Sequence, residues 1–206
     1  MGFYSKHILP SLINLTCKTS SLTKQREKVI PFATGNILEI GVGTGLNLPF
    51  YNSRNILKLT AIDPYEETWQ KREIDSSKLD YKFKFVKASA EELPFKNNTF
   101  DTIVITYSLC TIPDVDKALR EMSRVLKQDG TLIFCEHGVA PDKKVSATQD
   151  FINPIWKPLS GGCNLNRNIP ELIEKNGFTI QDLKSMYIPG WKFASYNFWG
   201  SAKKTL

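Results

Sequence analysis

The sequence has few of the residues that build metal centres, disulfide frameworks or membrane spans. Its four cysteines are widely spaced and form no Cys-x-x-Cys pair, and its only histidines are His7 and His137. This scarcity favours reduced thiols in a cytoplasmic protein and predicts no metal site. No apolar run approaches the roughly 20 residues that span a bilayer, and the first ten residues lack the apolar core of a secretory signal.

The sequence also lacks clusters of basic residues. The chain has 27 basic and 21 acidic residues, a net charge of +6, yet no run of four basic residues. Such spacing favours a solvated surface, although an anionic membrane surface or a nucleic acid remains open as a partner. With 206 residues, of which 41% are hydrophobic, the chain is long enough for one domain with a full core.

The first 34 residues differ from the rest. Residues 1–34 are rich in Ser, Thr and Lys, and the apolar spacing within 8–15 predicts a short amphipathic helix. We expect an N-terminal helical cap there, with peripheral membrane contact through this segment left open. Residues 35–206 would form the main domain, in which the polar, Pro/Gly/Trp-rich segment 138–168 would cover a ligand.

Strand-like and helix-like stretches alternate from residue 36 onward. This alternation predicts βαβ units and an α/β, doubly wound parallel sheet. The expected strands cover 36–40, 58–62, 82–87, 101–107, 131–136, 178–188 and 193–203, and the expected helices lie near 65–75, 113–127 and 169–176.

A glycine-rich segment is the most informative part of the sequence. A short apolar strand ends at Glu39 and is followed by Gly41, Gly43 and Gly45. Such a loop lets a ligand approach the backbone and is expected to lead into a helix with free N–H groups. The dinucleotide fingerprint would need glycine at Leu46. The carboxylate of Glu39 would repel a pyrophosphate but attract an amino group and a sulfonium.

A second carboxylate follows the next predicted strand. Asp63 would lie beside the glycine loop, at the crevice where the strand order reverses. One carboxylate can accept both hydroxyl groups of a ribose. The alternative is that Asp63 caps a helix that begins at Pro64.

Several segments resemble one enzyme family. The pattern E-x-G-x-G-x-G resembles the first motif of the class I S-adenosylmethionine-dependent methyltransferases, and residues 85–95 resemble the segment after their third strand. Residues 113–137 resemble a helix–turn–strand of the methyltransferases related to ubiquinone biosynthesis. Residues 136–138, 153–157 and 161–167 look like a subgroup that includes the membrane-associated thiol methyltransferases. The resemblance implies a Rossmann-like, seven-stranded, mostly parallel sheet with the last strand antiparallel.

The resemblance also implies a site. Ser89 stands where the family usually has Asp, which leaves the adenine contact to the Ala90 N–H and Glu91. Tyr107 and Ser108 would face the sulfonium and the acceptor. His137 would either take the acceptor's proton or hold the following loop. The expected cofactor-binding residues are Glu39, Gly41, Gly43, Gly45, Asn47, Asp63, Pro64, Ser89, Ala90, Glu91 and Thr106, and the expected catalytic residues are His137, Tyr107 and Ser108.

These observations predict a methyltransferase that uses S-adenosylmethionine, and no metal, to methylate a small, fairly apolar acceptor. A thiol, a quinol or a lipid head group would suit the aromatic residues of the cover, among them Trp156, Trp191 and Trp199, although such residues more often serve packing. Cys163 is a weaker candidate for the site. The alternatives are a non-catalytic S-adenosylmethionine-binding protein, a nicotinamide-dependent oxidoreductase and an RNA methyltransferase. The oligomeric state stays undetermined, and no nucleic acid is expected as a partner.

Overall fold

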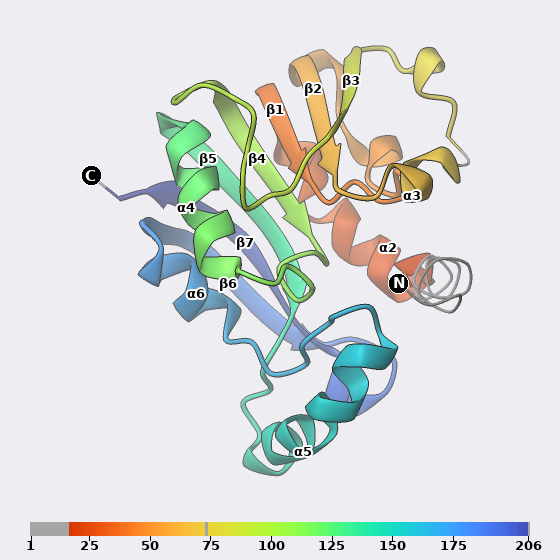
Figure 1. Cartoon of the computed structure of the whole chain (residues 1–206), viewed down its shortest axis with the longest axis vertical. Coiled ribbons are helices and arrows are strands. Elements are labelled where there is room, and N and C mark those ends of the chain that lie inside the picture. Colours follow the sequence, from red (N-terminus) through yellow and green to blue (C-terminus); the bar gives the residue numbers. More distant parts are fainter. Residues whose placement is uncertain (1–16, 73, 206) are drawn as a thin grey trace.

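The computed structural model describes residues 17–72 and 74–205 of the 206-residue chain. In this part of the chain, seven strands form one sheet in the order β3-β2-β1-β4-β5-β7-β6 (Figure 1). The strands are β1 (Gly35–Ile40), β2 (Ile56–Asp63), β3 (Lys82–Lys87), β4 (Phe100–Thr106), β5 (Leu126–His137), β6 (Phe178–Tyr187) and β7 (Tyr196–Lys204).

The sheet is parallel from β3 to β5 and antiparallel at its other edge. β1 pairs in parallel with both β2 and β4, so the strand order reverses between β1 and β4. β7 lies between β5 and β6 and is antiparallel to both. The predicted seven-stranded sheet with an antiparallel last strand is therefore confirmed. The carboxyl ends of β1, β2, β4 and β5 meet at one edge, where ligands bind in open α/β sheets.

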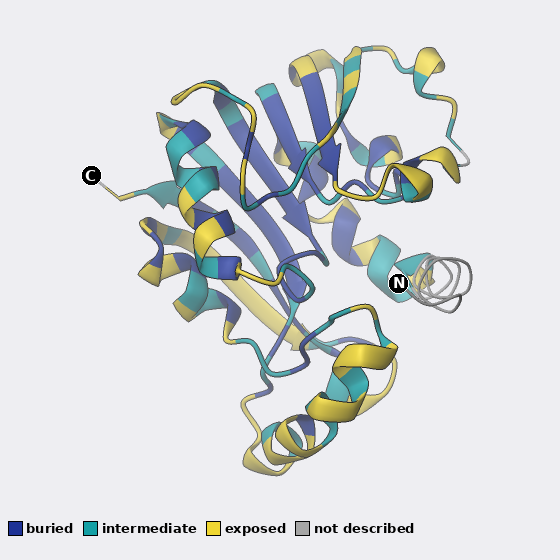
Figure 2. Ribbon diagram, in the orientation of Figure 1, coloured by how far each residue is buried: buried dark blue, intermediate teal, exposed yellow. Residues whose placement is uncertain are grey.

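Helices cover both faces of the sheet, because the central strands are buried on both sides. In β4, Ile103 and Ile105 belong to one buried cluster with Leu119 of α4, while Val104 belongs to the opposite cluster with Trp69 of α3. Successive strand residues point to opposite faces, so an all-apolar strand needs a cover on both sides. The central strands are dark in Figure 2 for this reason. The helices are α2 (Ser20–Glu27), α3 (Glu66–Gln70), α4 (Val115–Val125), α5 (Lys143–Leu159) and α6 (Ile169–Lys175).

The helix α4 confirms the clearest helical pattern of the sequence. The side chain of Asp114 accepts the backbone N–H of Lys117 at 2.9 Å and so caps the first turn. Val115, Leu119 and Met122 are buried along one stripe.

One expectation about local structure is wrong, and the structure contains one helix that the sequence analysis does not predict. The glycine loop does not lead into an α-helix, because the segment before β2 forms only two 3-10 turns, Leu48–Phe50 and Ser53–Asn55. Gly41, Gly43 and Gly45 have positive φ values, which a right-handed helix does not contain, so no helix begins within the loop. Segment 138–168, the predicted cover, contains the 17-residue helix α5, which is not among the helices expected from the sequence.

The helix α5 lies beyond the carboxyl ends of β4 and β5 (Figure 1) and is mostly exposed (Figure 2). Among the described residues, no helix combines the length and the apolar character that a bilayer crossing requires. The amphipathic helix expected within 8–15 lies outside the described residues. The described part of the proposed cap is α2, followed by the 3-10 turn Ile30–Phe32. The division into a cap and a main domain remains a prediction.

One buried glutamine attaches α5 to the rest of the domain. Gln149 is fully buried, and its Oε1 accepts the N–H of Ala140 at 2.9 Å. Its Nε2 lies 3.0 Å from each of three backbone carbonyl oxygens, those of Gly138, Leu165 and Phe193. Because these groups belong to three separate loops, Gln149 fixes the position of the helix over the sheet edge.

Replacing Gln149 with methionine keeps the volume but removes every one of these bonds. Buried backbone groups left without partners cost about 1–3 kcal/mol each, so we expect Gln149→Met to lower the free energy of unfolding by about 3 kcal/mol. Denaturant unfolding measures this loss. Gln181→Met is the matched control, because Gln181 is exposed on β6; equal stability of the two variants would contradict the role of Gln149.

Candidate active site

The glycine loop follows β1 at the edge where the strand order reverses. Gly41, Gly43 and Gly45 have φ values of 70°, 54° and 81°, which non-glycine residues rarely adopt. A Cβ on Gly41 would lie 2.2 Å from Ser108 Oγ, so glycine is required where the two loops touch. A Cβ on Gly43 would meet nothing within 4 Å. The loop therefore borders open space at Gly43, as a loop that receives a ligand should.

Asp63 lies at the end of β2 and is 7% exposed. Its Oδ2 accepts the N–H of Gly43 at 3.0 Å, and its Oδ1 accepts the N–H of Tyr65 at 2.9 Å. Burial raises the pKa of this carboxyl group, while the two backbone hydrogen bonds act in the opposite direction. The bond to Tyr65 closes a turn before α3, which begins at Glu66 and has no side-chain cap, so the alternative of a helix cap at Pro64 is wrong. Each oxygen keeps a second lone pair, so the ribose role fits the same geometry and stays a prediction.

Glu39 is 1% exposed and is held by two donors. Its Oε1 accepts Nδ2 of Asn47 at 2.9 Å, and its Oε2 accepts the hydroxyl of Tyr51 at 3.0 Å. Asn47 Nδ2 also lies 3.0 Å from Thr106 Oγ1 and so connects β1 to β4. Burial raises the pKa of Glu39 to about 7. Tyr51 was missed from the sequence, because no spacing rule links it to a carboxylate twelve positions earlier.

The segment after β3 is tied to α4 more than to the glycine loop. Glu91 Oε1 accepts the N–H of Asp114 at 2.6 Å, and the Glu91 N–H is 3.2 Å from Ser89 Oγ. Ala90 is buried, and its N–H remains the predicted adenine contact. Pro64 is exposed at the start of the turn before α3. Glu91 thus has a structural partner that the sequence did not indicate.

The loop after β4 carries a strained residue at the sheet edge. Tyr107 has a φ of 51°, rare for a non-glycine residue, and its hydroxyl donates to Asn197 Oδ1 at 2.9 Å. The guanidinium of Arg26 in α2 lies 5.1 Å from the Tyr107 ring centroid. Ser108 is 8% exposed, and its hydroxyl is within reach of the carbonyl oxygens of Thr106 (3.1 Å) and Ile40 (3.4 Å). Tyr107 and Ser108 therefore make structural contacts at the place where the acceptor was expected.

His137 ends β5, and its ring lies against two thiols. Its Nε2 is 3.1 Å from Cys163 Sγ, and one donor atom of each of Cys110, His137 and Cys163 lies within 4.8 Å of the other two. A hydrogen bond from Cys110 and the nearby His137 hold the pKa of Cys163 well below its usual value. Burial opposes a charged imidazole, but the neighbouring Cys163 outweighs it and raises the pKa of His137. All four cysteines of the chain are free thiols.

The loop that carries Cys163 is fastened to the loop after β4. The side-chain Nδ2 of Asn164 donates to the Cys110 carbonyl at 2.8 Å, and the Asn164 backbone N–H donates to the same oxygen at 2.9 Å. Arg167 donates to the carbonyl oxygens of Leu109 and Ile112. Sequence reasoning had marked residues 161–167 by resemblance but had not given Asn164 or Arg167 a role.

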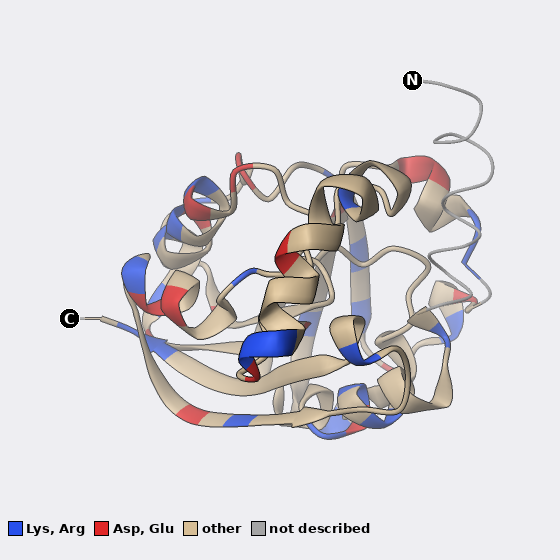
Figure 3. Cartoon of the chain, turned by 90° about the horizontal axis from the view of Figure 1, so that it is seen from below, with Lys and Arg blue, Asp and Glu red and all other residues tan. Residues whose placement is uncertain are grey.

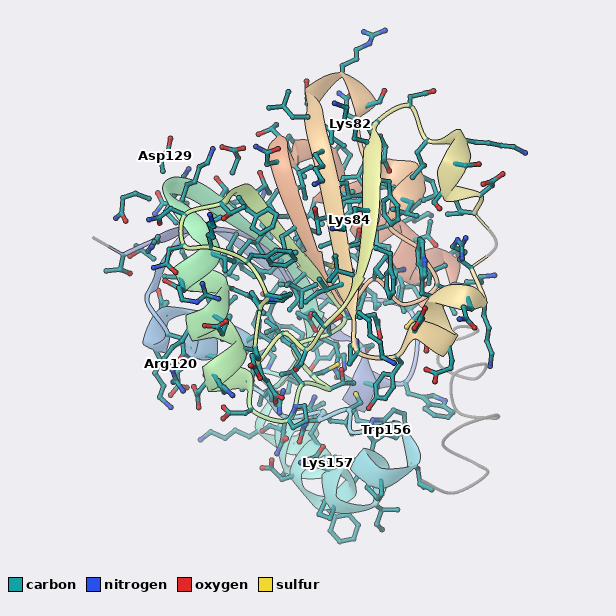
Figure 4. All side chains as sticks on the ribbon, turned by 45° about the horizontal axis from the view of Figure 1, so that its top comes forward. Lys82, Lys84, Arg120, Asp129, Trp156 and Lys157 are labelled. Carbon is teal, nitrogen blue, oxygen red and sulfur yellow. The ribbon has the colours of Figure 1, made fainter. Side chains whose placement is uncertain are left out.

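Aromatic rings cover this side of the site. Trp156 of α5 lies with its ring centroid 6.4 Å from that of Trp191 and 5.8 Å from that of Phe193. Figure 4 shows Trp156 between α5 and the body of the domain. Trp199 lies apart from this group, because its ring packs under the ammonium of Lys28 at 4.2 Å. Of the three tryptophans expected over the acceptor, Trp156 and Trp191 lie together and Trp199 does not.

The strand order, the antiparallel β7 and the glycine loop between Glu39 and Asp63 define a Rossmann-like, class I methyltransferase fold. Two solved structures share it: the YcgJ protein of Bacillus subtilis, with a TM-score of 0.67 at 18% identity over 90% of this chain and 98% of that one, and an S-adenosylmethionine-dependent methyltransferase of Leishmania major, with a TM-score of 0.69 at 14% identity over 97% and 80%. At such low identities these likenesses show the fold alone.

Sequence comparisons give the family. The methyltransferase-domain family model matches residues 38–134. The thiol S-methyltransferase TMT1B of Rattus norvegicus is 34% identical over 153 residues, which cover 72% of this chain but only 62% of the relative's length. TMT1A of Homo sapiens is 30% identical over 175 residues, covering 82% and 70% of the two lengths. The ubiquinone/menaquinone biosynthesis C-methyltransferase UbiE of Rickettsia bellii is 38% identical over 130 residues, covering 59% and 51%.

The chain therefore belongs to the S-adenosylmethionine-dependent methyltransferases, in the group that contains these thiol S-methyltransferases. Its fold is the fold of that family, and its cofactor is the methyl donor that the family shares. The residues that hold the donor remain predictions of the geometry described above.

Asp63 provides the first test of the donor site. We expect Asp63→Ala to weaken S-adenosylhomocysteine binding by about 10- to 100-fold, because hydrogen bonds to a charged group contribute about 1.5–3 kcal/mol. Calorimetric titration measures the affinity, and thermal unfolding checks that the fold persists. Asp75→Ala is the matched control, since Asp75 also accepts a backbone N–H but at an exposed turn. An affinity unchanged from the wild type in Asp63→Ala would contradict the ribose role.

The raised pKa of Glu39 predicts that the affinity for S-adenosylhomocysteine depends on pH. Its pKa of about 7 means that the carboxyl group is mostly protonated at about pH 6 and mostly ionised at about pH 7.5. Only the ionised form attracts the ligand's amino group, so affinity for S-adenosylhomocysteine should rise by up to about tenfold over this interval. Titrations at both pH values check this. Glu39→Gln should remove the rise, and Glu67→Gln, at an exposed glutamate of α3, should keep it.

Proposed function

We propose that the protein transfers a methyl group from S-adenosylmethionine to the sulfur of a small, fairly apolar thiol. The observation that carries this proposal is the position of Cys110, His137 and Cys163. They lie at the carboxyl ends of β4 and β5, the same sheet edge that holds Gly43 and Asp63. The thiol S-methyltransferases among the relatives support the choice of sulfur as the acceptor atom.

The chain's own residues would bind the donor and exclude water. The backbone at Gly43 borders the space for the methionine part, Asp63 would accept the ribose hydroxyls, and the Ala90 N–H would meet the adenine edge. When bound, S-adenosylmethionine supplies a methyl group already activated on a sulfonium, so the protein mainly has to align the acceptor with it.

The acceptor side is built for a weakly polar molecule. The rings of Trp156, Trp191 and Phe193 give an apolar cover beside the thiol-imidazole cluster. Basic residues, by contrast, are dispersed over many elements with acidic ones between them (Figure 3), which argues against an RNA acceptor. A reducing compartment such as the cytoplasm suits a site whose thiols must stay free.

A thiol must lose its proton before its sulfur can attack. His137 was expected to take this proton as a base. In the structure, however, Nε2 of His137 already faces Cys163, and its Nδ1 is buried without a hydrogen-bond partner among the described residues. We therefore assign removal of the acceptor's proton to Cys110, His137 and Cys163 together rather than to His137 alone.

An acceptor panel tests the proposal. Purified protein with methyl-labelled S-adenosylmethionine should label small aromatic and aliphatic thiols, with Asp63→Ala as the donor-site control. Transfer to quinols, to phosphatidylethanolamine vesicles or to RNA, with none to thiols, would contradict the choice of acceptor. Tight S-adenosylhomocysteine binding with no transfer to any acceptor would instead identify a non-catalytic binding protein.

A further inference from the structure

Three soft metal-ligand atoms converge at the acceptor side of the site. Cys110 comes from the loop after β4, His137 ends β5, and Cys163 follows α5. Their donor atoms lie within 4.8 Å of one another, and His137 Nε2 is 3.1 Å from Cys163 Sγ. The sequence predicted no metal site because it has only two histidines and four widely spaced cysteines. The fold brings one histidine and two of these cysteines together.

The backbone around the three side chains is held in place independently of them. Asn164 donates twice to the Cys110 carbonyl, and the N–H of Val139 donates to the Arg167 carbonyl at 2.9 Å. Arg167 in turn holds the loop that carries Cys110 through its bonds to neighbouring carbonyl oxygens. The cluster is thus preorganised by bonds that do not use its sulfur atoms or its imidazole, and these groups contact one another.

The spacing suits a tetrahedral ion. Zinc–sulfur bonds of about 2.3 Å and zinc–nitrogen bonds of about 2.0–2.1 Å place tetrahedral donor atoms roughly 3.6–3.8 Å apart. The observed range, from 3.1 Å to at most 4.8 Å, reaches these values with side-chain shifts of about an ångström or less. Two thiolates and one imidazole are a donor set that favours zinc over magnesium, calcium or manganese.

The surroundings supply further polar groups that lack partners. Among the described residues, Glu136 Oε2 and His137 Nδ1 are buried without a hydrogen bond. Glu136 is 0% exposed, and buried polar atoms of this kind normally bind water, an ion or a ligand. A metal-bound histidine also normally donates its second ring N–H to a water or an acceptor group, which His137 Nδ1 is available to do.

We propose that Cys110, His137 and Cys163 bind a zinc ion whose fourth position takes the sulfur of the acceptor thiol. This inference rests on the proposed thiol-methyltransferase activity. Three protein ligands and one open position are the arrangement of catalytic zinc sites, whereas four protein ligands make a closed, structural site. No fourth His, Cys, Asp or Glu of the described residues joins the group. Cys17, a free thiol outside it, is the residue to exclude as a fourth ligand.

The zinc ion would promote loss of the acceptor thiol's proton. A thiol that coordinates zinc loses its proton, here to solvent, and stays bound as a thiolate. A lone pair of that sulfur then forms the new sulfur–carbon bond to the donor's methyl group. The bond between this carbon and the donor's sulfonium breaks, its electron pair stays on the donor's sulfur, and S-adenosylhomocysteine and a thioether result. The thioether is a weaker zinc ligand than the thiolate and leaves the open position.

Metal content provides the first readout, independent of activity. Protein produced with added zinc and passed through a desalting column should hold about one zinc ion per chain by mass spectrometry. Competition with a chromophoric chelator then measures affinity. Cys163→Ser and Cys110→Ser should each weaken zinc binding by at least roughly 100-fold. Cys135→Ser is the matched control, because this buried thiol bonds to the Tyr107 hydroxyl outside the cluster.

Cobalt substitution tests the open position. The cobalt protein should show thiolate-to-cobalt charge-transfer bands and the intense d–d bands of a tetrahedral site, and both should change when an acceptor thiol from the panel is added. Cys17→Ser should keep the zinc affinity of the wild type. A large loss of affinity in Cys17→Ser, or a cobalt spectrum that no thiol alters, would mean a closed site and would overturn the proposal.

The zinc proposal and the activity proposal can fail separately. After removal of zinc by a chelator, S-adenosylhomocysteine affinity should persist while thiol methylation falls, and added zinc should restore it. Full thiol methylation by zinc-free protein would overturn the zinc proposal and leave the activity intact. A disulfide between Cys110 and Cys163 in place of bound zinc, detected by mass spectrometry of freshly reduced and re-oxidised protein, would also overturn it. Zinc bound through the three residues, with no transfer to any thiol, would overturn the acceptor-ligand step and the proposed function together.

Discussion

The site depends on one buried carboxylate. Glu136 is 0% exposed on β5, and its Oε1 accepts the backbone N–H groups of Ser108 at 2.7 Å and Leu109 at 3.0 Å. Burial raises the pKa of Glu136 to about 7. These two bonds fix the course of the loop after β4, since backbone N–H groups inside a protein need an acceptor. The loop then delivers Cys110 to one side and touches the glycine loop at Gly41 on the other.

The placement of the residues expected to bind the donor was predictable from the sequence, because the signals for it are local. The strand ending at Glu39, the spaced glycines and the carboxylate at Asp63 are separated by short segments whose geometry the chain sets by itself. The fold confirms their placement at one sheet edge. The failure here was also local: an α-helix was expected after the glycines, and the 3-10 turn Leu48–Phe50, with Pro49 inside it, took its place.

The cluster proposed for the acceptor was not predictable in the same way, because long-range contacts build it. Nothing in the spacing of Cys110, His137 and Cys163 indicates that they meet. The contacts that bring them together are side-chain bonds of Asn164 and Arg167 to backbone carbonyl oxygens far away in the chain. Every residue has a backbone carbonyl group, so a bond to one does not depend on the residue type of the partner. A sequence pattern therefore cannot reveal such bonds. The helix α5 was missed for a related reason: Pro154 and Pro158 lower its local helix propensity, and tertiary contacts compensate.

The strand order has an evolutionary consequence. Most groups expected to hold the donor come from the β1, β2 and β3 side of the sheet. The cluster proposed for the acceptor comes from the loop after β4, the end of β5 and the loop after α5. The two sides meet where β1 pairs with β4, at the bond between Asn47 and Thr106, and where Gly41 approaches Ser108. Distant substitutions that share no partner have nearly additive effects. Related enzymes can therefore change their acceptor through substitutions in the β5 and α5 side alone. The residues that bind S-adenosylmethionine, the shared methyl donor, would stay the same.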